Sequence, residues 1–250
     1  MDIRKTWQSI NIINLMLASL VLLLIYNLYI FGIGNLQSVI VIVATTSLLD
    51  IAVNYMKEKR LFLPKTAIIT GLILGLIIDS SLYLLVLTAA IAILSKHIIK
   101  IKGRHIFNPA NFALFVALFL PVSESWWGMY NPLPVILLGL LIVYKLKRYH
   151  QVLPFLVVNA ILTLVIFAAD VGKTIDHMTS GILLFFVFYM MIEPTTSPMH
   201  KKSRIAFGIL TGIFAVILYT VWLPAAFVVA LFFADICVPV LDRVFGPKAL

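Results

Sequence analysis

Long apolar stretches separated by short polar segments follow one another along the whole chain. The first two, Ile10 to Phe31 and Ser38 to Met56, are long enough as helices to cross or nearly cross a hydrocarbon layer of about 30 Å. Eight more follow, at residues 66–78, 82–94, 107–120, 132–144, 152–168, 180–192, 205–221 and 223–241. The pattern predicts an all-α integral membrane protein with about ten transmembrane helices, forming a single polytopic membrane domain over residues 1–250.

Four of these stretches are too short to cross a membrane alone. Those at 66–78, 82–94, 107–120 and 180–192 would span only about 20 Å as helices. Because hydrocarbon cannot hydrogen-bond a free backbone group, short broken helices must lie inside a bundle, where protein groups or water satisfy their ends. The sequence therefore predicts broken helices around a site near the middle of the membrane.

Composition and charge support a membrane protein and suggest its orientation. The chain is 62% hydrophobic and 12% charged, with a mean hydropathy of +1.10, which excludes a water-soluble domain. With the N-terminus inside and one crossing per stretch, every Lys and Arg except Lys173 falls on one side. The bias predicts a multi-pass protein of the cell membrane with cytoplasmic N- and C-termini, and it explains the net charge of +9 better than nucleic-acid binding does. The lone Cys237 excludes a multi-cysteine metal centre, and no metal site is expected.

A weak internal repeat joins the third stretch of each half. KTAIITGLILGL (Lys65 to Leu76) and KTIDHMTSGILLFF (Lys173 to Phe186) both pair Lys-Thr with a later glycine that would start an apolar helix. With five spans per half, the second half would be upside down relative to the first. The sequence thus suggests an inverted five-plus-five repeat, with halves at about 1–121 and 132–250. Chance resemblance between membrane helices of low diversity is the alternative.

The most informative stretch is SKHIIKIKGRHIFNPANFALF, from Ser95 to Phe115. Asn108 is a natural N-cap and Pro109 a natural first helical residue. The helix start would lie below the membrane surface and direct free N–H groups at an anion or a polar ring. The cationic donors that precede it are Lys96, His97, Arg104 and His105. An ordinary topology-setting loop would explain the same residues.

A second stretch, MMIEPTTSPMHKKSR, places Glu193 at the end of a short helix. Two prolines enclose Thr195, Thr196 and Ser197. An acid beside three hydroxyls at a broken helix is typical of a cation or proton site. A solvated turn whose hydroxyls cap the next helix is the alternative.

Four single residues also depart from the apolar pattern. Asp50 and Asp235 lie about two turns inside their spans, where a carboxylate is costly enough to suggest an ion pathway. A buried ion pair or a protonated acid would explain them equally well. Trp126 and Trp127 predict the outer aromatic belt, and flavin stacking is the weaker interpretation of them.

Taken together, KxxITGLILGL, SKHxxxxxGRHIFNPANFAL and SGILLFFVFYMMIEPTTSP resemble the NqrB/RnfD family of flavin-carrying membrane subunits. The match runs in the family's order from about Thr66 to Gly212. The resemblance implies a membrane subunit of an Rnf-type or sodium-translocating quinone reductase complex. Such a subunit assembles with other membrane subunits and couples electron transfer to the translocation of sodium ions or protons.

The resemblance also implies a flavin site and an ion path. The candidate cofactor-binding residues are Thr70, Gly71, Lys96, Arg104, His105, Asn108, Pro109, Asn111, Thr195, Thr196 and Ser197, and the candidate ion-pathway residues are Asp50, Glu193 and Asp235. Family members carry FMN as a phosphoester on the threonine of a Ser-Gly-Ala-Thr motif in a long outer loop. Here that loop is VSESWWGMYN, residues 122–131, which contains no threonine. We therefore expect FMN or riboflavin to bind noncovalently, and no catalytic residue is assigned.

The alternative function is a stand-alone secondary transporter or channel built on the same inverted repeat, without redox chemistry. A purely structural assembly subunit is a third possibility. A flavin absorption spectrum of the purified protein would favour the redox subunit, whereas a colourless protein that moves a solute in liposomes would favour the transporter.

Overall fold

The structure, a computed structural model, describes residues 9–101, 103–221 and 225–246, and a helix lies over the described part of each of the ten apolar stretches. The helices are α2 (Ile12–Phe31), α3 (Leu36–Glu58), α4 (Lys65–Gly75), α5 (Leu82–Ile98), α6 (Pro109–Ala117), α7 (Pro132–Leu146), α8 (Tyr149–Ile166), α9 (Val171–Met178), α10 (Gly181–Phe185), the π-helix η2 (Phe186–Met190), α11 (Lys201–Val221) and α12 (Ala226–Phe245). A 3-10 turn, η1, covers Trp127–Met129, and two short strands, β1 (Lys100–Ile101) and β2 (Arg104–His105), pair as a hairpin.

Four helices of the described chain, α2, α3, α8 and α11, are long and apolar enough to cross a membrane by themselves. The α9 helix and the α10–η2 helix together pass the same test as a pair bent by 46°. The long helices leave large apolar side chains such as Leu48, Ile161 and Ile217 exposed, as contact with lipid requires. These features identify an all-α membrane protein.

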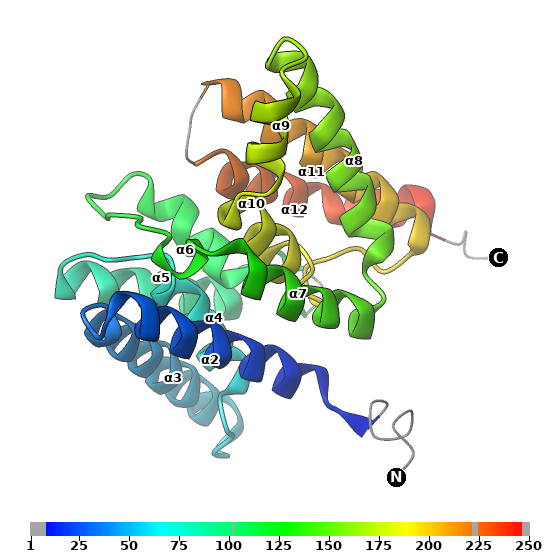
Figure 1. Ribbon diagram of the computed structural model, residues 1–250. Coiled ribbons are helices and arrows are strands. Elements are labelled where there is room, and N and C mark those ends of the chain that lie inside the picture. Colours follow the sequence, from blue (N-terminus) through cyan, green and yellow to red (C-terminus); the bar gives the residue numbers. More distant parts are fainter. Residues whose placement is uncertain (1–8, 102, 222–224, 247–250) are drawn as a thin grey trace.

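The short helices lie inside, as their length predicts. Eight of the eleven residues of α4 and all five of η2 are buried. Figure 1 shows α2 and α3 on one side of the molecule and α8 and α11 on the other, with α4, α6, α7 and α10 between them. The fourth stretch is longer than predicted, because its helix α5 continues to Ile98, and seven of its seventeen residues are buried.

The polar stretch before the eighth span forms a helix that the hydropathy pattern did not predict. The α9 helix runs from Val171 to Met178 and contains the Lys-Thr of the second repeat motif. Gly181 is the first residue of α10, but Gly71 lies in the interior of α4, close to Thr46 and Val43 of α3. The expectation that each glycine starts a helix is therefore correct for Gly181 and wrong for Gly71.

The loop of residues 122–131 folds back into the protein and closes the broken end of α4. The Ser125 and Trp126 N–H groups donate to the Ile77 carbonyl at 2.8 and 2.9 Å, and the Gly128 N–H donates to the Leu76 carbonyl at 3.0 Å. The indole Nε1 of Trp127 donates to the Gly75 carbonyl at 2.9 Å. A helix leaves its last carbonyls without intrahelical partners. The loop supplies those partners where lipid could not.

The two tryptophans are consequently buried, at 6% and 8% exposure for Trp126 and Trp127. The prediction that they mark an outer aromatic belt is wrong, since a belt tryptophan presents its ring to the membrane interface. Trp126 adopts a positive φ of 50°, a left-handed conformation that non-glycine residues seldom take. Asn27 of α2 donates to the Gly128 carbonyl at 2.9 Å and holds the folded loop against the long helix.

Close packing of this loop predicts that Gly181→Ala is destabilising. A Cβ atom on Gly181 would overlap the Met129 carbonyl oxygen, a backbone atom that cannot turn away. Overpacking of this kind costs about 1–3 kcal/mol, so the purified variant should lose its folded fraction at a lower temperature. The matched control is Gly34→Ala, because nothing lies within 4 Å of a Cβ atom there. Equal thermal stability of the two variants would contradict the folded position of the loop.

Candidate functional site

The inner cavity, of about 380 Å³, lies among α2, α4, η2, the start of α6 and the turn after η2. Its lining residues are Ile12, Ile13, Met16, Thr66, Ile69, Thr70, Ile73, Lys96, His105, Asn108, Pro109, Leu146, Tyr189, Glu193, Pro194 and Thr195. Most of the wall is apolar, and the polar groups come from the motifs identified in the sequence. Six of the eleven candidate cofactor-binding residues line it: Thr70, Lys96, His105, Asn108, Pro109 and Thr195.

The start of α6 is buried and capped as predicted. Asn108 Oδ1 accepts from the Asn111 N–H at 3.1 Å, and Pro109 is the first helical residue. The backbone N–H of Asn108 donates to Asp235 Oδ2 on α12 at 3.1 Å, while its Nδ2 donates to the Met190 carbonyl at 3.0 Å. One asparagine therefore joins α6, η2 and α12 at the edge of the inner cavity.

Asn111 and Gly71 contribute from outside the cavity lining. Asn111 is fully buried and its Nδ2 donates to the Val228 carbonyl of α12 at 3.0 Å. Gly71 allows α4 to approach α3 closely. Both residues position the helices whose other faces line the cavity.

Asp50 is held by two basic groups from the end of α5. Its Oδ1 accepts from Lys96 Nζ at 3.0 Å and lies 2.8 Å from His97 Nε2. Lys96 Nζ also donates to Thr66 Oγ1 at 2.9 Å, at the start of α4. Since Asp50 is only 3% exposed, its charge depends on these partners. The structure thus contains the buried ion pair, which was one of the interpretations of Asp50 from the sequence.

The β1–β2 hairpin places two basic residues over the turn after η2. Gly103, with a φ of 82°, forms the tight turn of the hairpin. His105 Nε2 lies 3.1 Å from Glu193 Oε1, and the Arg104 guanidinium donates to the Thr195 carbonyl at 2.6 Å. The basic loop and the EPTTSP turn, separated by about ninety positions in the sequence, thus form one contact.

The far side of the same turn is packed against α8. Ser197 Oγ donates to the Met191 carbonyl at 3.1 Å and accepts from Gln151 Nε2 at 3.2 Å, and Thr196 is buried. Arg148 donates to the Pro198 and Pro194 carbonyls at 3.1 and 3.4 Å. Burial, together with nearby Arg204 and Arg104, lowers the pKa of Arg148 to about 10. Thr196 and Ser197 therefore hold the turn and lie outside the cavity lining.

Several buried oxygens near the start of α6 have no hydrogen-bond partner among the described residues. They are Asp235 Oδ1, Glu193 Oε2 and Asn111 Oδ1. Asp235 is fully buried, and Glu193 lines the cavity. An unpaired buried acceptor is costly. Of the three residues only Glu193 lines the cavity, so its oxygen can accept an N–H of a ligand there, and the carboxylate of Asp235 can accept a proton or a cation.

Sequence reasoning missed three residues of the site. Tyr189 lies on the cavity wall, with its hydroxyl 2.6 Å from Ser19 Oγ. Its place on a π-helix could not be recognised in an apolar run, although single π-turns are frequent at functional sites. Arg148 was counted only among the basic residues of the inner side, and Gln151 was not singled out, because only the folded chain brings them to the turn after η2.

The amino-acid sequence matches the family described as NQR2, RnfD, RnfE over residues 3–131 and 121–250. A protein of Methanosarcina acetivorans that is named as a subunit of an ion-translocating oxidoreductase complex is 27% identical over 215 residues, which are 76% of this chain and 73% of that protein. Proteins of the same name from Stutzerimonas stutzeri and Shewanella sediminis are 31% and 29% identical over 146 and 125 residues. These alignments cover 56% and 45% of this chain but only 40% and 34% of the two bacterial proteins.

The geometry predicts that Asn108→Ala destabilises the protein. The change removes the cap of α6 and the donor to the Met190 carbonyl. A lost cap alone costs about 0.5–2 kcal/mol, so thermal unfolding should begin at a lower temperature. The control is Asn35→Ala, because Asn35 is the N-cap residue of α3 but makes no side-chain cap bond. If the two variants unfold at the same temperature, the buried cap does not hold α6.

Proposed function

The chain belongs to the NQR2, RnfD, RnfE family, and on this premise we propose that it is a membrane subunit of an ion-translocating oxidoreductase complex of the Rnf type. In this proposal the subunit binds a flavin noncovalently, couples electron transfer to the translocation of sodium ions or protons, and assembles with other membrane subunits. The observation that carries the proposal is the inner cavity, where the basic loop, the start of α6 and the turn after η2 meet around one space.

The inner cavity suits a flavin in size and chemistry. At about 380 Å³ it lies in the range of pockets for small cofactors. Ile12, Met16 and Ile69 supply apolar wall for a flat ring, and Lys96 and Asn108 supply donors for ring oxygens. Glu193 Oε2, buried and without a partner in the described chain, offers an acceptor for a ring N–H. FMN or riboflavin supplies the electron transfer, and these residues bind and orient its ring.

The proposed ion path uses the three carboxylates. Asp235 and Glu193 each keep one oxygen without a partner among the described groups, so each can take up a proton or a sodium ion. Asp50 is paired with Lys96 and His97. A change of charge in the inner cavity would change the electrostatic energy of this ion pair, because Lys96 also lines the cavity. The coupling we propose is therefore electrostatic, between the flavin and acids in or beside the wall of its cavity.

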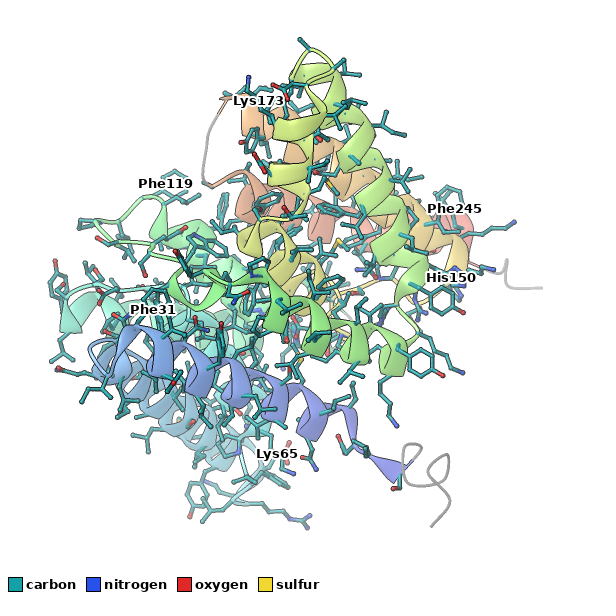
Figure 2. The ribbon with its side chains drawn as sticks, viewed as in Figure 1. Phe31, Lys65, Phe119, His150, Lys173 and Phe245 are labelled. Atoms are coloured by element: carbon teal, nitrogen blue, oxygen red, sulfur yellow. The ribbon has the colours of Figure 1, made fainter. Side chains whose placement is uncertain are left out.

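We further propose ten crossings with cytoplasmic termini. Figure 2 supports this topology, since Lys65, His150 and Phe245 lie at the lower and right-hand side of the molecule, whereas Phe31, Phe119 and Lys173 lie at the upper and left-hand side. These are the two sides to which one crossing per apolar stretch assigns them.

The packing of the helices supports the inverted repeat. In the first half α2 packs on α4, α3 on α5 and α5 on α6. In the second half α7 packs on α10 and η2, α8 on α11 and α11 on α12. Three pairings thus recur at corresponding positions of the two halves, as a five-plus-five repeat requires, whereas the extensive contact of α3 with α4 has no comparable counterpart between α8 and α10.

The proposal predicts that the protein is isolated with flavin that denaturation releases. The loop at 122–131 offers only Ser123 and Ser125 as hydroxyls for an ester, and its backbone is folded against α4. Acid precipitation should leave flavin in the supernatant, and a denaturing gel under ultraviolet light should show no fluorescent band. A control variant with Ser123→Ala and Ser125→Ala should retain the same flavin content. A fluorescent band near 28 kDa would contradict noncovalent binding, and absence of flavin from both gel and supernatant would favour the transporter.

The topology predicts opposite labelling of two exposed lysine positions. In a Cys237→Ser background, Lys173→Cys should react with an impermeant thiol reagent added outside intact cells, and Lys201→Cys should not. Both side chains are exposed, so membrane sidedness alone decides the difference. After permeabilisation both should react. Labelling of Lys201→Cys in intact cells would rule out the proposed orientation.

A further inference from the structure

The helices α8 and α11 lie side by side and run in the same direction. A Cβ atom on Gly208 of α11 would overlap the Gln151 carbonyl of α8. One turn later along both helices, Gly212 lies against Val158. The two helices therefore begin at the same end of the pair, on the side of the molecule where Figure 2 labels His150. Because the start of a helix carries a partial positive charge, two such charges are combined there.

Both helix starts carry basic side chains where acidic ones would be stabilising. Arg148 is the N-cap residue of α8. The first four residues of α11 include Lys201, Lys202 and Arg204. Neither helix has an acidic residue in its first turn. None of these four cations has an ion-pair partner within residues 9–101, 103–221 and 225–246.

Two of the cations converge on one carbonyl oxygen. Nη1 of Arg148 and Nε of Arg204 donate to the Pro198 carbonyl at 3.1 and 3.0 Å. Arg148 is only 5% exposed, and its Nε has no partner among the described groups. The carboxylate of Asp242 acts on Arg148, but both of its oxygens accept the Met199 N–H. Two guanidinium groups this close repel each other, so an added anion would stabilise them.

Two further residues join these arginines in a cluster, here called the basic corner, which consists of Arg148, His150, Lys201 and Arg204. Lys201 precedes Arg204 by three positions and therefore lies on the same side of α11. Gly208 follows Arg204 by four positions, which turns this side toward α8. Lys201 and Arg204 lie close enough to His150 to act on its charge. Since Lys201 is exposed and Arg148 is buried, the basic corner reaches from the interior to the surface.

An apolar surface begins beside the basic corner and follows α8 into the membrane. Leu153, Val157 and Ile161 are 57%, 55% and 57% exposed. They recur every four residues, so they form one side of the helix. Because α8 is long and apolar enough to cross a membrane, this side contacts lipid chains. A ligand with an anionic head and apolar chains matches both the corner and the surface, whereas a soluble anion matches the corner alone.

We propose that the basic corner binds the phosphate group of an anionic phospholipid whose acyl chains lie along α8. The exposed ammonium of Lys201 and the guanidinium of Arg204 donate to the phosphate oxygens. The N–H groups of Lys201 and Lys202 have no acceptor in the described chain, and at a helix start such groups favour phosphate. Phosphatidylcholine fits less well, because its choline group brings a positive charge to a site already crowded with cations. The proposed function does not use this site.

Lipid titration of the purified, delipidated protein in detergent micelles, followed by native mass spectrometry, tests the proposal. The probes are dioleoyl phosphatidylglycerol, which is anionic, dioleoyl phosphatidylcholine, which has the same chains and no net charge, and inorganic phosphate. Phosphatidylglycerol should bind the most tightly of the three. Lys201→Gln should weaken its binding about fivefold, the factor expected for one basic residue at a membrane surface. The matched control is Lys59→Gln, because Lys59 is also exposed but lies at the end of α3.

Arg204→Gln should also weaken binding of phosphatidylglycerol, and Arg60→Gln, which changes an exposed arginine outside the basic corner, is its control. If Arg204→Gln does not fold, because its bond to the Pro198 carbonyl is lost, Lys201→Gln still decides.

Equal affinities for the two lipids, or equal affinities of Lys201→Gln and Lys59→Gln for phosphatidylglycerol, would overturn the proposal. Inorganic phosphate that binds as tightly as phosphatidylglycerol would assign the basic corner to a soluble phosphate compound and would overturn the lipid assignment. Binding of none of the three probes would leave the cations to an acidic protein partner and would overturn it as well. Flavin content is measured separately, so failure here leaves the proposed function intact.

Discussion

The interior of this protein depends on one constraint, which is that a helix that stops within the membrane must have its free backbone groups satisfied by protein. At the end of α4, residues 122–131 return into the bundle and donate to the carbonyls of Gly75, Leu76 and Ile77. At the start of α6, Asn108 caps the helix and its own N–H donates to Asp235. These two sets of hydrogen bonds hold the short helices α4 and α6 among the long helices.

The capped start of α6 belongs to the wall of the inner cavity, where Asn108 and Pro109 lie. Residues of α4 that precede its closed end, such as Thr66 and Thr70, line the same cavity. Glu193 and Asp235 each use one oxygen to fix this arrangement and keep the other without a partner in the described chain. The same two carboxylates therefore hold the structure together and keep an oxygen that can accept a further partner. For this reason the candidate site lies where the helices are broken.

The parts of this arrangement that depend on local sequence were predictable. Apolar runs located the ten stretches, and the Asn-Pro pair located the start of α6, since capping and hydropathy act within a few residues. Long-range contacts were not predictable. Nothing local indicates that Trp127 donates to α4, and a tryptophan in a short polar loop near the membrane edge ordinarily indicates the aromatic belt.

The misjudged elements have the same physical origin. The α9 helix was not predicted because its mixture of polar and apolar residues has no long apolar run, and the burial of its Thr174 and His177 is a property of the folded bundle. Tyr189 was not recognised as a residue of the site, because an apolar run does not reveal a π-turn. The site was thus predicted through its capped helix and its charged motifs, while the aromatic and backbone groups that complete the site required the structure.

Amide hydrogen exchange of the loop at 122–131 tests most directly the claim that protein groups close the broken helices. The account predicts slow exchange for the N–H groups of Ser125, Trp126 and Gly128, because each donates to a carbonyl at the end of α4 and residues 126–129 are buried. The exposed loop at residues 60–63 gives the reference for rapid exchange. Exchange of the three N–H groups as rapid as that of residues 60–63 would show that the loop lies open to water and would contradict the account.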